Sequence, residues 1–197
     1  SSYTFLQTVS QDSRSSQMAE PYILFAGRIS PYKGLDYLFP AMEKVHARCP
    51  SCKLVVAGGG KYHFDITGYQ QLDYIDIRNR FIPDEELVSL IQNASFLVCP
   101  YTDATQSRVI MSAYAFFKPV IATNVGGLPE MVEHNHYGLI IKGKDEQALA
   151  DAIITMWENP DLVNDFSRQI EQDYATGENS WKCIAEKLNM EYKRIVR

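Results

Sequence analysis

Residues 100–133 read PYTDATQSRVIMSAYAFFKPVIATNVGGLPEMVE, and they contain the most informative pattern in the chain. An apolar run at residues 95–99 ends at Pro100, and a polar turn then leads into a helical pattern. A second apolar run, residues 119–122, then ends in a polar, glycine-containing loop. This order of strand, loop, helix, strand and loop aims two loops and one helix N-terminus at the same edge of a parallel sheet, where open α/β sheets bind ligands.

Apolar runs and helical patterns also alternate along most of the rest of the chain. The continuous apolar runs at residues 22–26 and 53–57 are typical of buried parallel strands. We expect strands at residues 22–26, 53–57, 78–82, 95–99, 119–122 and 139–141, and helical patterns over residues 35–45, 84–91, 106–117, 128–134, 145–157, from 160 and from 180. Asp84, Asp145 and Ser180 are the expected N-caps of three of them. The alternation predicts an α/β fold with a doubly wound, Rossmann-like parallel sheet and helices at its C-terminal end.

Composition narrows the possible functions. The chain has 197 residues, of which 46% are apolar and 22% charged, and its net charge is −5. A general nucleic-acid binder is not expected, since no basic face is available for a phosphate backbone. No run approaches the roughly 20 apolar residues of a membrane span. Residues 1–20, rich in Ser and Gln, are expected to be a linker from an upstream domain, because the chain starts with Ser and looks like part of something longer.

The cysteines and histidines do not form a recognisable metal site. Cys49 and Cys52 have CxxC spacing, but no second pair and no matching histidines follow. A loop with two thiols in a reducing compartment is therefore favoured over a zinc or redox site. His134 and His136 have no further ligand cluster near them, and surface histidines are the favoured interpretation. We expect no metal.

Three glycines, Gly58, Gly59 and Gly60, follow the second strand. They do not form GxGxxG, and no convincing acidic residue ends a strand about 20 residues later, so a dinucleotide fingerprint is not supported. The alternative is a backbone that turns sharply or lets another group approach closely.

Arg28 and Lys33 lie on one predicted strand-to-helix loop, at the carboxyl edge of the sheet. Two cations five residues apart on such a loop can both reach one anion of diphosphate size, Arg as a fork and Lys as a point charge. Two solvated loop charges are the alternative.

The predicted central helix opens at Thr105-Gln106-Ser107-Arg108. Either Thr105 or Ser107 can cap it, and the free N–H groups of its first turn form an anion site beside the Arg108 cation. Simple capping, worth about 1 kcal/mol, with Arg108 in solvent is the alternative. The later Gly126-Gly127 pair indicates either a loop that passes close to a ligand or a tight turn.

Three segments in order carry a family resemblance: FAGRISPYKG at residues 25–34, LVVAGGG at 54–60 and KPVIATNVGGLPE at 118–130. They resemble the C-terminal, donor-binding half of a GT-B retaining glycosyltransferase of the "glycosyl transferases group 1" family, over roughly residues 20–160. The helix expected from Ser180 is similar to the closing helix of that family. The resemblance implies a nucleotide-sugar-binding domain at residues 21–175 and a closing helix at 176–197.

The resemblance also implies partners and site residues. The donor is a nucleotide-sugar, the acceptor is held by an N-terminal domain of the same chain, and no cofactor is expected because the nucleotide-sugar is a substrate. The residues implied to contact the donor diphosphate are Arg28, Lys33, Ser107, Arg108 and Val109. Those implied around the nucleoside and sugar are Gly27, Phe81, Ile82, Asp103, Thr105, Gln106 and Ser112.

The chain departs from the family at two positions. Many members carry two glutamates eight positions apart, which fall here on Ala104 and Ser112. Those contacts to the sugar and the ribose cannot be carried over, although Asp103 substitutes for the first if the loop shifts by one residue. A polysaccharide-assembly subgroup has a similar Thr-Gln-Ser segment, against which only Arg108 is unusual. That cation either binds the donor phosphates or partly fills their site.

The resemblance therefore implies a hexosyltransferase-type enzyme that moves a sugar from a nucleotide-sugar to a glycan or lipid-linked acceptor in polysaccharide biosynthesis. It is expected in the cytoplasm, with peripheral contact to the inner face of the membrane through the missing half. The fragment alone is expected to be inactive. The alternative is a degenerate GT-B domain that binds nucleotide or a partner without catalysis. A GT-B epimerase or phosphorylase matches the motif order less well.

Overall fold

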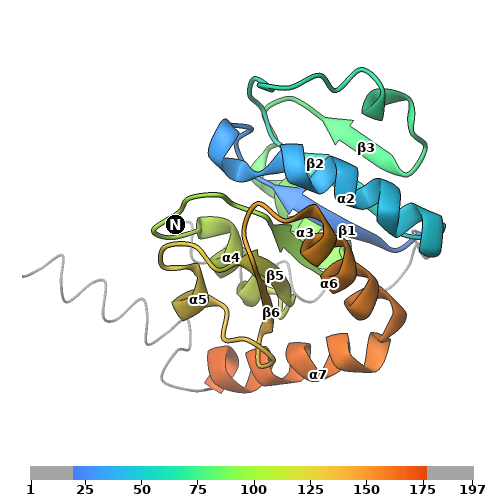
Figure 1. The fold of residues 1–197 in the computed structure, drawn as a ribbon. Helices are drawn as coiled ribbons and strands as arrows, with labels where there is room; N and C mark the ends of the chain where they lie inside the picture. Colours follow the sequence, from blue (N-terminus) through green and yellow to red (C-terminus); the bar gives the residue numbers. More distant parts are fainter. Residues whose placement is uncertain (1–19, 177–197) are drawn as a thin grey trace, which may run out of the picture.

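Six parallel strands form one sheet, in the order β3-β2-β1-β4-β5-β6 (Figure 1). The structure is a computed structural model that describes residues 20–176. The strands are β1 (Tyr22–Ala26), β2 (Lys53–Ala57), β3 (Ile75–Arg78), β4 (Leu97–Cys99), β5 (Val120–Thr123) and β6 (Gly138–Ile141). The strand order reverses between β1 and β4, which makes this point the topological switch point of the sheet. The predicted doubly wound, Rossmann-like sheet is confirmed.

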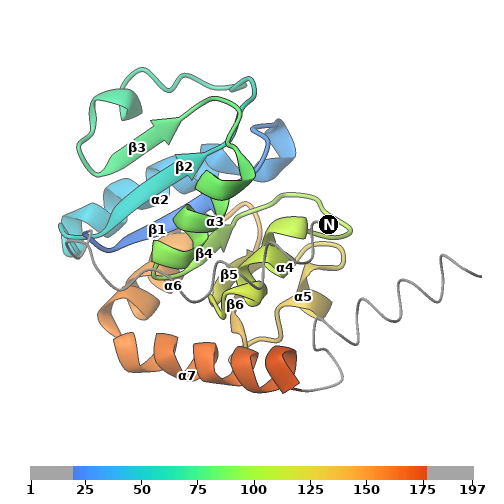
Figure 2. The ribbon, with the colours of Figure 1, turned by 180° about the vertical axis from the view of Figure 1, so that it is seen from behind.

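Helices cover both faces of the sheet. The elements are η2 (Pro31–Lys33), α2 (Leu35–Arg48), η3 (Tyr69–Gln71), α3 (Asp84–Asn93), α4 (Arg108–Ala115), α5 (Leu128–Met131), α6 (Glu146–Glu158), α7 (Pro160–Glu171) and η4 (Gln172–Thr176). Helices α2 and α6 lie side by side on the face seen in Figure 1, whereas α3 and α4 lie on the face seen in Figure 2. Helix α7 packs against α6.

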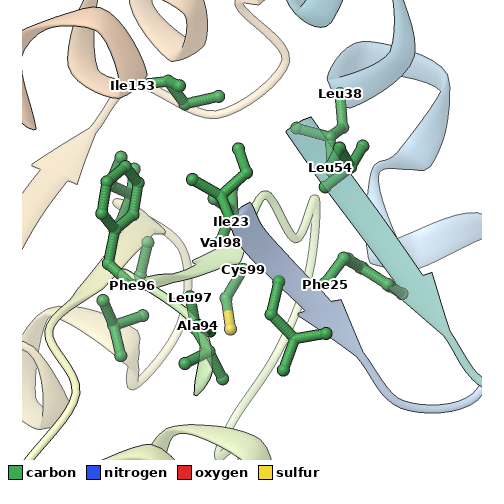
Figure 3. Packing of buried hydrophobic residues seen from close by; sticks show 14 of the residues in the cluster. Ile23, Phe25, Leu38, Leu54, Ala94, Phe96, Leu97, Val98, Cys99 and Ile153 are labelled. Atoms are coloured by element: carbon green, nitrogen blue, oxygen red, sulfur yellow. The ribbon is translucent and has the colours of Figure 1, made fainter. Parts of the chain in front are cut away.

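The core lies between these layers. The strands are short, continuous apolar runs because helices cover both faces of the sheet, so the side chains on both faces are buried. Leu38 of α2 and Ile153 of α6 lie over the β1 and β2 side chains and the start of β4 on one side of the sheet (Figure 3). Each fully buried Leu or Ile side chain contributes about 1.5–3 kcal/mol of transfer free energy. This rigid core fixes the positions of the loops at the carboxyl edge.

One predicted strand is misplaced. The expected strand at residues 78–82 is wrong, since β3 spans Ile75–Arg78 and residues 79–82 form the loop before α3. β3 is an edge strand, and its true signal is the alternation of Ile75 and Ile77 with the exposed Asp76. The apolar Phe81 misled the prediction, because its side chain is 81% exposed.

The helix starts agree with the sequence in part. Ser107 caps α4 and Asp145 caps α6, each accepting a hydrogen bond from a backbone N–H in the first turn, as predicted. The alternative cap Thr105 lies outside the helix, which begins at Arg108 rather than at residue 106. The predicted cap Asp84 is instead the first residue of α3, and Pro83 occupies the cap position.

The predicted linker at residues 1–20 and closing helix at 176–197 lie almost entirely outside the described residues, and so does the Ser180 cap. Within residues 20–176, no helix combines the length and apolar character that crossing a membrane requires.

Candidate functional site

The loops that follow β1 and β4 touch each other at the switch point. Gly34 ends the first loop with φ +72°, and a Cβ placed there would lie 1.9 Å from the carbonyl oxygen of Pro100. The N–H of Thr102 donates to the carbonyl of Tyr32 over 2.8 Å. These backbone contacts bring the two loops predicted to bind a ligand to one place.

Lys33 lies where the two loops meet. Its side chain is only 9% exposed, and its Nζ lies 3.6 Å from the centroid of the Tyr101 ring and 5.1 Å from that of Tyr32. No carboxylate of residues 20–176 lies within 4 Å of this ammonium. Burial lowers the pKa of Lys33, opposed by the nearby Cys99 thiol. A desolvated cation held by aromatic faces and without an acidic partner attracts an anion from solvent.

Arg28 lies on the same loop and stands between two surface hollows. Its side chain is exposed and forms no ion pair within the described part of the chain. One hollow, of ≈ 350 Å³, is lined by Arg28, Ile29, Ser30, Pro31, Tyr32, Gly60 and Lys61. The other, of ≈ 340 Å³, is lined by Gly27, Arg28, Ala57, Gly58, Gly59, Phe81, Ile82 and Leu87. The structure thus brings together Gly27, Phe81 and Ile82, three of the residues that the family resemblance places around the nucleoside and sugar.

Helix α4 presents its N-terminus to the loop after β1. The buried Ser107 side chain accepts from the N–H of Ile110 over 3.4 Å, while the Ser107 N–H donates to the Met131 sulfur. Val109 Cγ2 would lie 3.5 Å from a Cβ on Gly27, so the first turn of α4 faces the start of that loop. Arg108 is exposed at the first helical position. The positive end of α4 therefore lies beside Gly27, at the start of the loop that carries Arg28 and Lys33.

The other predicted sugar-side residues lie in or just after the loop that leads to α4. Asp103, Thr105 and Gln106 are exposed there and form no side-chain ion pair among the described residues. Ser112 lies one turn inside α4, and its hydroxyl donates to the carbonyl of Arg108 over 3.0 Å. The sugar-side hydroxyl predicted at Ser112 is thus already engaged within the helix.

The glycine segments at residues 58–60 and 126–127 both lie against backbone of the site's loops. For residues 58–60 this is the close approach of another group that was one of the two interpretations of the sequence, whereas Gly126-Gly127 was expected to pass close to a ligand or to form a tight turn. A Cβ on Gly58 would lie 1.9 Å from the carbonyl oxygen of Gly27, within the loop after β1. A Cβ on Gly126 would lie 1.9 Å from the carbonyl oxygen of Ala104, and the Gly127 N–H donates to that same oxygen. These glycines therefore hold the site's loops in place, because any side chain would collide with backbone.

The loop that carries Phe81 is braced by ion pairs that the sequence analysis did not find. Arg80 donates two hydrogen bonds, of 2.8 and 2.6 Å, to the carboxylate of Glu86, and a third to the carbonyl of Phe81. Arg78 also donates to Glu86. The only sequence signal was the i, i+6 charge spacing, which is too common to be used. The contact of Tyr101 with Lys33 was likewise not predicted.

Thiols and histidines play structural parts here. Cys49, Cys52 and Cys99 are buried and free, and burial raises the pKa of Cys52 to about 12. His134 Nδ1 accepts from the N–H of Ile140, and His136 contacts Asp173. Residues 20–176 contain no group of three or more His, Cys, Asp or Glu side chains that could hold a metal ion.

Together, the strand order and the cationic switch point define a Rossmann-like α/β domain with an anion-attracting edge. The chain belongs to the Glycosyl transferases group 1 family, whose sequence model matches residues 20–159. It is similar to the uncharacterized glycosyltransferase MJ1607 of Methanocaldococcus jannaschii, with 30% identity over 185 residues that cover 88% of this chain and 45% of the relative. The chain spans about half the length of the curated relatives it matches.

Solved structures share the fold. Sucrose-phosphate synthase from Thermosynechococcus elongatus matches with a TM-score of 0.76 and 25% identity, over 92% of this chain and 47% of the other. Anabaena Alr3699/HepE, in complex with UDP and glucose, matches with a TM-score of 0.70 and 22% identity, over 95% of this chain and 51% of the other.

Proposed function

We propose that this chain is the donor-binding half of a retaining glycosyltransferase, which moves a sugar from a nucleotide-sugar to a glycan or lipid-linked acceptor in polysaccharide biosynthesis. The acceptor is held by an N-terminal domain of the same protein. The observation that carries the proposal is the position of Lys33, a desolvated ammonium without an acidic partner in the described chain, beside the N-terminus of α4.

We assign a role to each part of this edge. The hollow lined by Gly27, Phe81 and Ile82 takes the nucleoside, since it combines apolar walls with exposed backbone. Arg28, at the rim of that hollow, and Lys33 take the diphosphate. The complex of HepE with UDP and glucose, on the same fold, supports a nucleotide-sugar as the donor.

Transfer builds negative charge on the departing diphosphate. Arg28, Lys33 and the positive end of α4 are fixed positive groups that stabilise this charge as the bond to the sugar breaks. We assign no base on this half, because in a retaining transfer the leaving phosphate itself can assist the incoming hydroxyl. The role of this half of the enzyme is thus to hold the leaving diphosphate and to neutralise its charge.

The side chains that contact the sugar differ from those of many relatives. Ala104 and Ser112 replace the two glutamates that many relatives have, and the Ser112 hydroxyl is bonded to the helix backbone. Asp103, Thr105 and Gln106 are exposed on the adjoining loop and are the side chains that remain to contact the sugar.

A second candidate function is supported by the same substitutions. Without carboxylates at positions 104 and 112, and with the Arg108 cation at the helix start, the domain would bind a nucleotide or a partner without turnover. The two candidates share the diphosphate site and differ only in catalysis by the longer protein.

Calorimetric titration of the 197-residue chain with UDP and GDP tests the shared site. We expect binding of at least one of them, and roughly tenfold weaker binding for Arg28→Ala and for Lys33→Ala, the effect of about 1.4 kcal/mol per lost charged contact. Arg168→Ala, which removes the same kind of charge from α7, is the matched control. Absence of binding, or equal affinity in all variants, would overturn the assignment.

Turnover separates the two candidates. We expect sugar transfer only by the longer protein that contains the acceptor domain, and none by residues 1–197. Transfer by this chain alone would contradict the proposed division of labour. Nucleotide binding without any transfer by the longer protein would establish the non-catalytic alternative instead.

A further inference from the structure

Tyr101 touches both of the elements that face the proposed diphosphate. It follows β4 at the switch point and is fully buried. The face of its ring lies 3.6 Å from the Lys33 ammonium, on the loop after β1. Its hydroxyl lies 3.4 Å from the hydroxyl of Ser107, the residue that caps α4.

Further contacts hold Tyr101 in place. Its carbonyl oxygen accepts a hydrogen bond of 2.5 Å from the Thr123 hydroxyl at the end of β5. The Cys99 thiol interacts with the hydroxyls of both Tyr101 and Ser107 below the site. Tyr32 packs edge-on against the Tyr101 ring at 6.3 Å between centroids. The side chain is therefore immobilised in a network that joins three strands of the sheet.

We propose that Tyr101 is a positioning residue of this site: its ring holds the Lys33 ammonium and its hydroxyl contacts the Ser107 cap, so one side chain sets the spacing between the two groups that bind the diphosphate. The inference rests on the proposed function, because it presupposes that Lys33 and the start of α4 bind that ligand.

The chemistry explains why an aromatic residue suits this place. A carboxylate beside Lys33 would neutralise the ammonium and repel the phosphates, whereas a ring face stabilises the cation by its quadrupole and leaves the N–H donors free for the ligand. The titratable side chains that face the ammonium are Tyr32 on its own turn, and Tyr101 and Cys99 at the end of β4. Among these, the Tyr101 ring is the group in closest contact.

Two substitutions separate the ring from the hydroxyl. Tyr101→Leu removes the ring face that holds the Lys33 ammonium in place, and we expect about tenfold weaker UDP binding at pH 7.5, as for Lys33→Ala. Tyr101→Phe keeps the ring and loses only the contacts of the hydroxyl with Ser107 and Cys99, so a loss of about threefold or less is expected.

The pH profile of binding distinguishes positioning from a structural role. Burial lowers the pKa of Lys33, and loss of the ring removes a group that favours the charged form. The alkaline limb of UDP binding should therefore move to lower pH in Tyr101→Leu and stay in place in Tyr101→Phe. The titration of the ligand itself is the same for every variant and cancels in the comparison. A purely structural role for the ring would weaken binding without moving the limb.

A measurement on the unaltered chain covers the case in which Tyr101→Leu does not fold. Because the Lys33 Nζ lies 3.6 Å from the centroid of the ring, the NMR signals of the adjacent ε-methylene protons should be shifted upfield of those of the exposed lysines and should move when UDP is added. Signals at ordinary lysine positions would overturn the inference.

If Lys33→Ala does not weaken UDP binding, the proposed function itself fails. If Lys33→Ala weakens binding but Tyr101→Leu alters neither affinity nor pH limb, only the role of Tyr101 fails.

Discussion

Gly34 and the carbonyl oxygen of Pro100 are in such close contact that a Cβ at position 34 would lie 1.9 Å from that oxygen. This contact joins the loop after β1 to the loop after β4 at the point where the strand order reverses. Lys33 immediately precedes Gly34, and Tyr101 immediately follows Pro100. The position of the cation over the ring therefore depends on a residue without a side chain.

Gly34→Ala should destabilise the fold and weaken nucleotide binding together. The substitution adds a backbone collision to a strained φ of +72°, so we expect a loss of about 2–4 kcal/mol in the free energy of unfolding. Urea denaturation measures this loss. The control is Gly68→Ala, because nothing lies within 4 Å of a Cβ there, and it should change stability by less than about 1 kcal/mol. Equal stability of the two variants would contradict the observed contact.

Glu86→Gln should loosen the loop that lines the proposed nucleoside hollow. The carboxylate holds Arg80, which in turn donates to the carbonyl of Phe81, so its loss frees that loop. We expect nucleotide affinity to fall roughly twofold to fivefold by calorimetry. Glu85→Gln changes the neighbouring exposed residue of α3 and should leave affinity unchanged. Equal affinity in both variants would contradict a role for the Arg80–Glu86 ion pair in nucleotide binding.

Arg108→Ala tests what the unusual cation at the start of α4 does. If Arg108 binds phosphate, its removal weakens UDP binding by roughly fivefold to tenfold and reduces the salt dependence of binding. Titrations at two salt concentrations measure both effects, with Arg168→Ala as the control for lost charge. Tighter binding by Arg108→Ala would show instead that the side chain partly fills the phosphate site.

Asp173→Asn should lower stability near neutral pH and lose this effect in acid. Hydrogen bonds from Tyr137, at 2.7 Å, and from His136 lower the pKa of Asp173. A carboxyl group with a lowered pKa stabilises the fold above its unfolded value of about 3.9, and this contribution disappears as pH falls through the folded value. Since the side chain is 42% exposed, we expect only about 1 kcal/mol at pH 7.

Thermal unfolding of Asp173→Asn and the unaltered chain between pH 3 and pH 7 measures this difference. The gap between their melting temperatures should be widest near pH 7 and should shrink toward pH 3. Glu171→Gln, which removes an exposed carboxylate two residues away, should show no such gap. A gap as wide at pH 3 as at pH 7 would contradict the hydrogen-bonded carboxylate.

Much of the fold could be predicted from the sequence, because buried parallel strands are continuous apolar runs. The run at residues 22–26 predicted β1 with its observed bounds, and that at 53–57 predicted β2. β3 was misplaced because an edge strand is only half-buried, and its alternating pattern is weaker than the apolar pair at Phe81 and Ile82. Phe81 stays exposed because Arg80 and Glu86 hold its loop outside the sheet.

The site could be predicted only as far as the loops that carry it. Arg28, Lys33 and Ser107 were identified because cations and caps at strand ends meet at one edge of a parallel sheet. The burial of Lys33 against Tyr101 could not be predicted, since it depends on the distance between two loops that are about 70 residues apart in sequence. Ser112 was assigned to the nucleoside and sugar by resemblance alone, and the bond of its hydroxyl to the Arg108 carbonyl is a local helix feature.

The central claim is that a nucleoside diphosphate binds at the switch point between β1 and β4. NMR titration of the 197-residue chain with UDP and GDP tests it most directly, because each backbone amide reports its own position. We predict that the largest shifts fall on residues 27–33, 81–82 and 107–110, while the amides of α7 stay unchanged. Shifts that are absent from these three segments, or that centre on another part of the chain, would contradict the account.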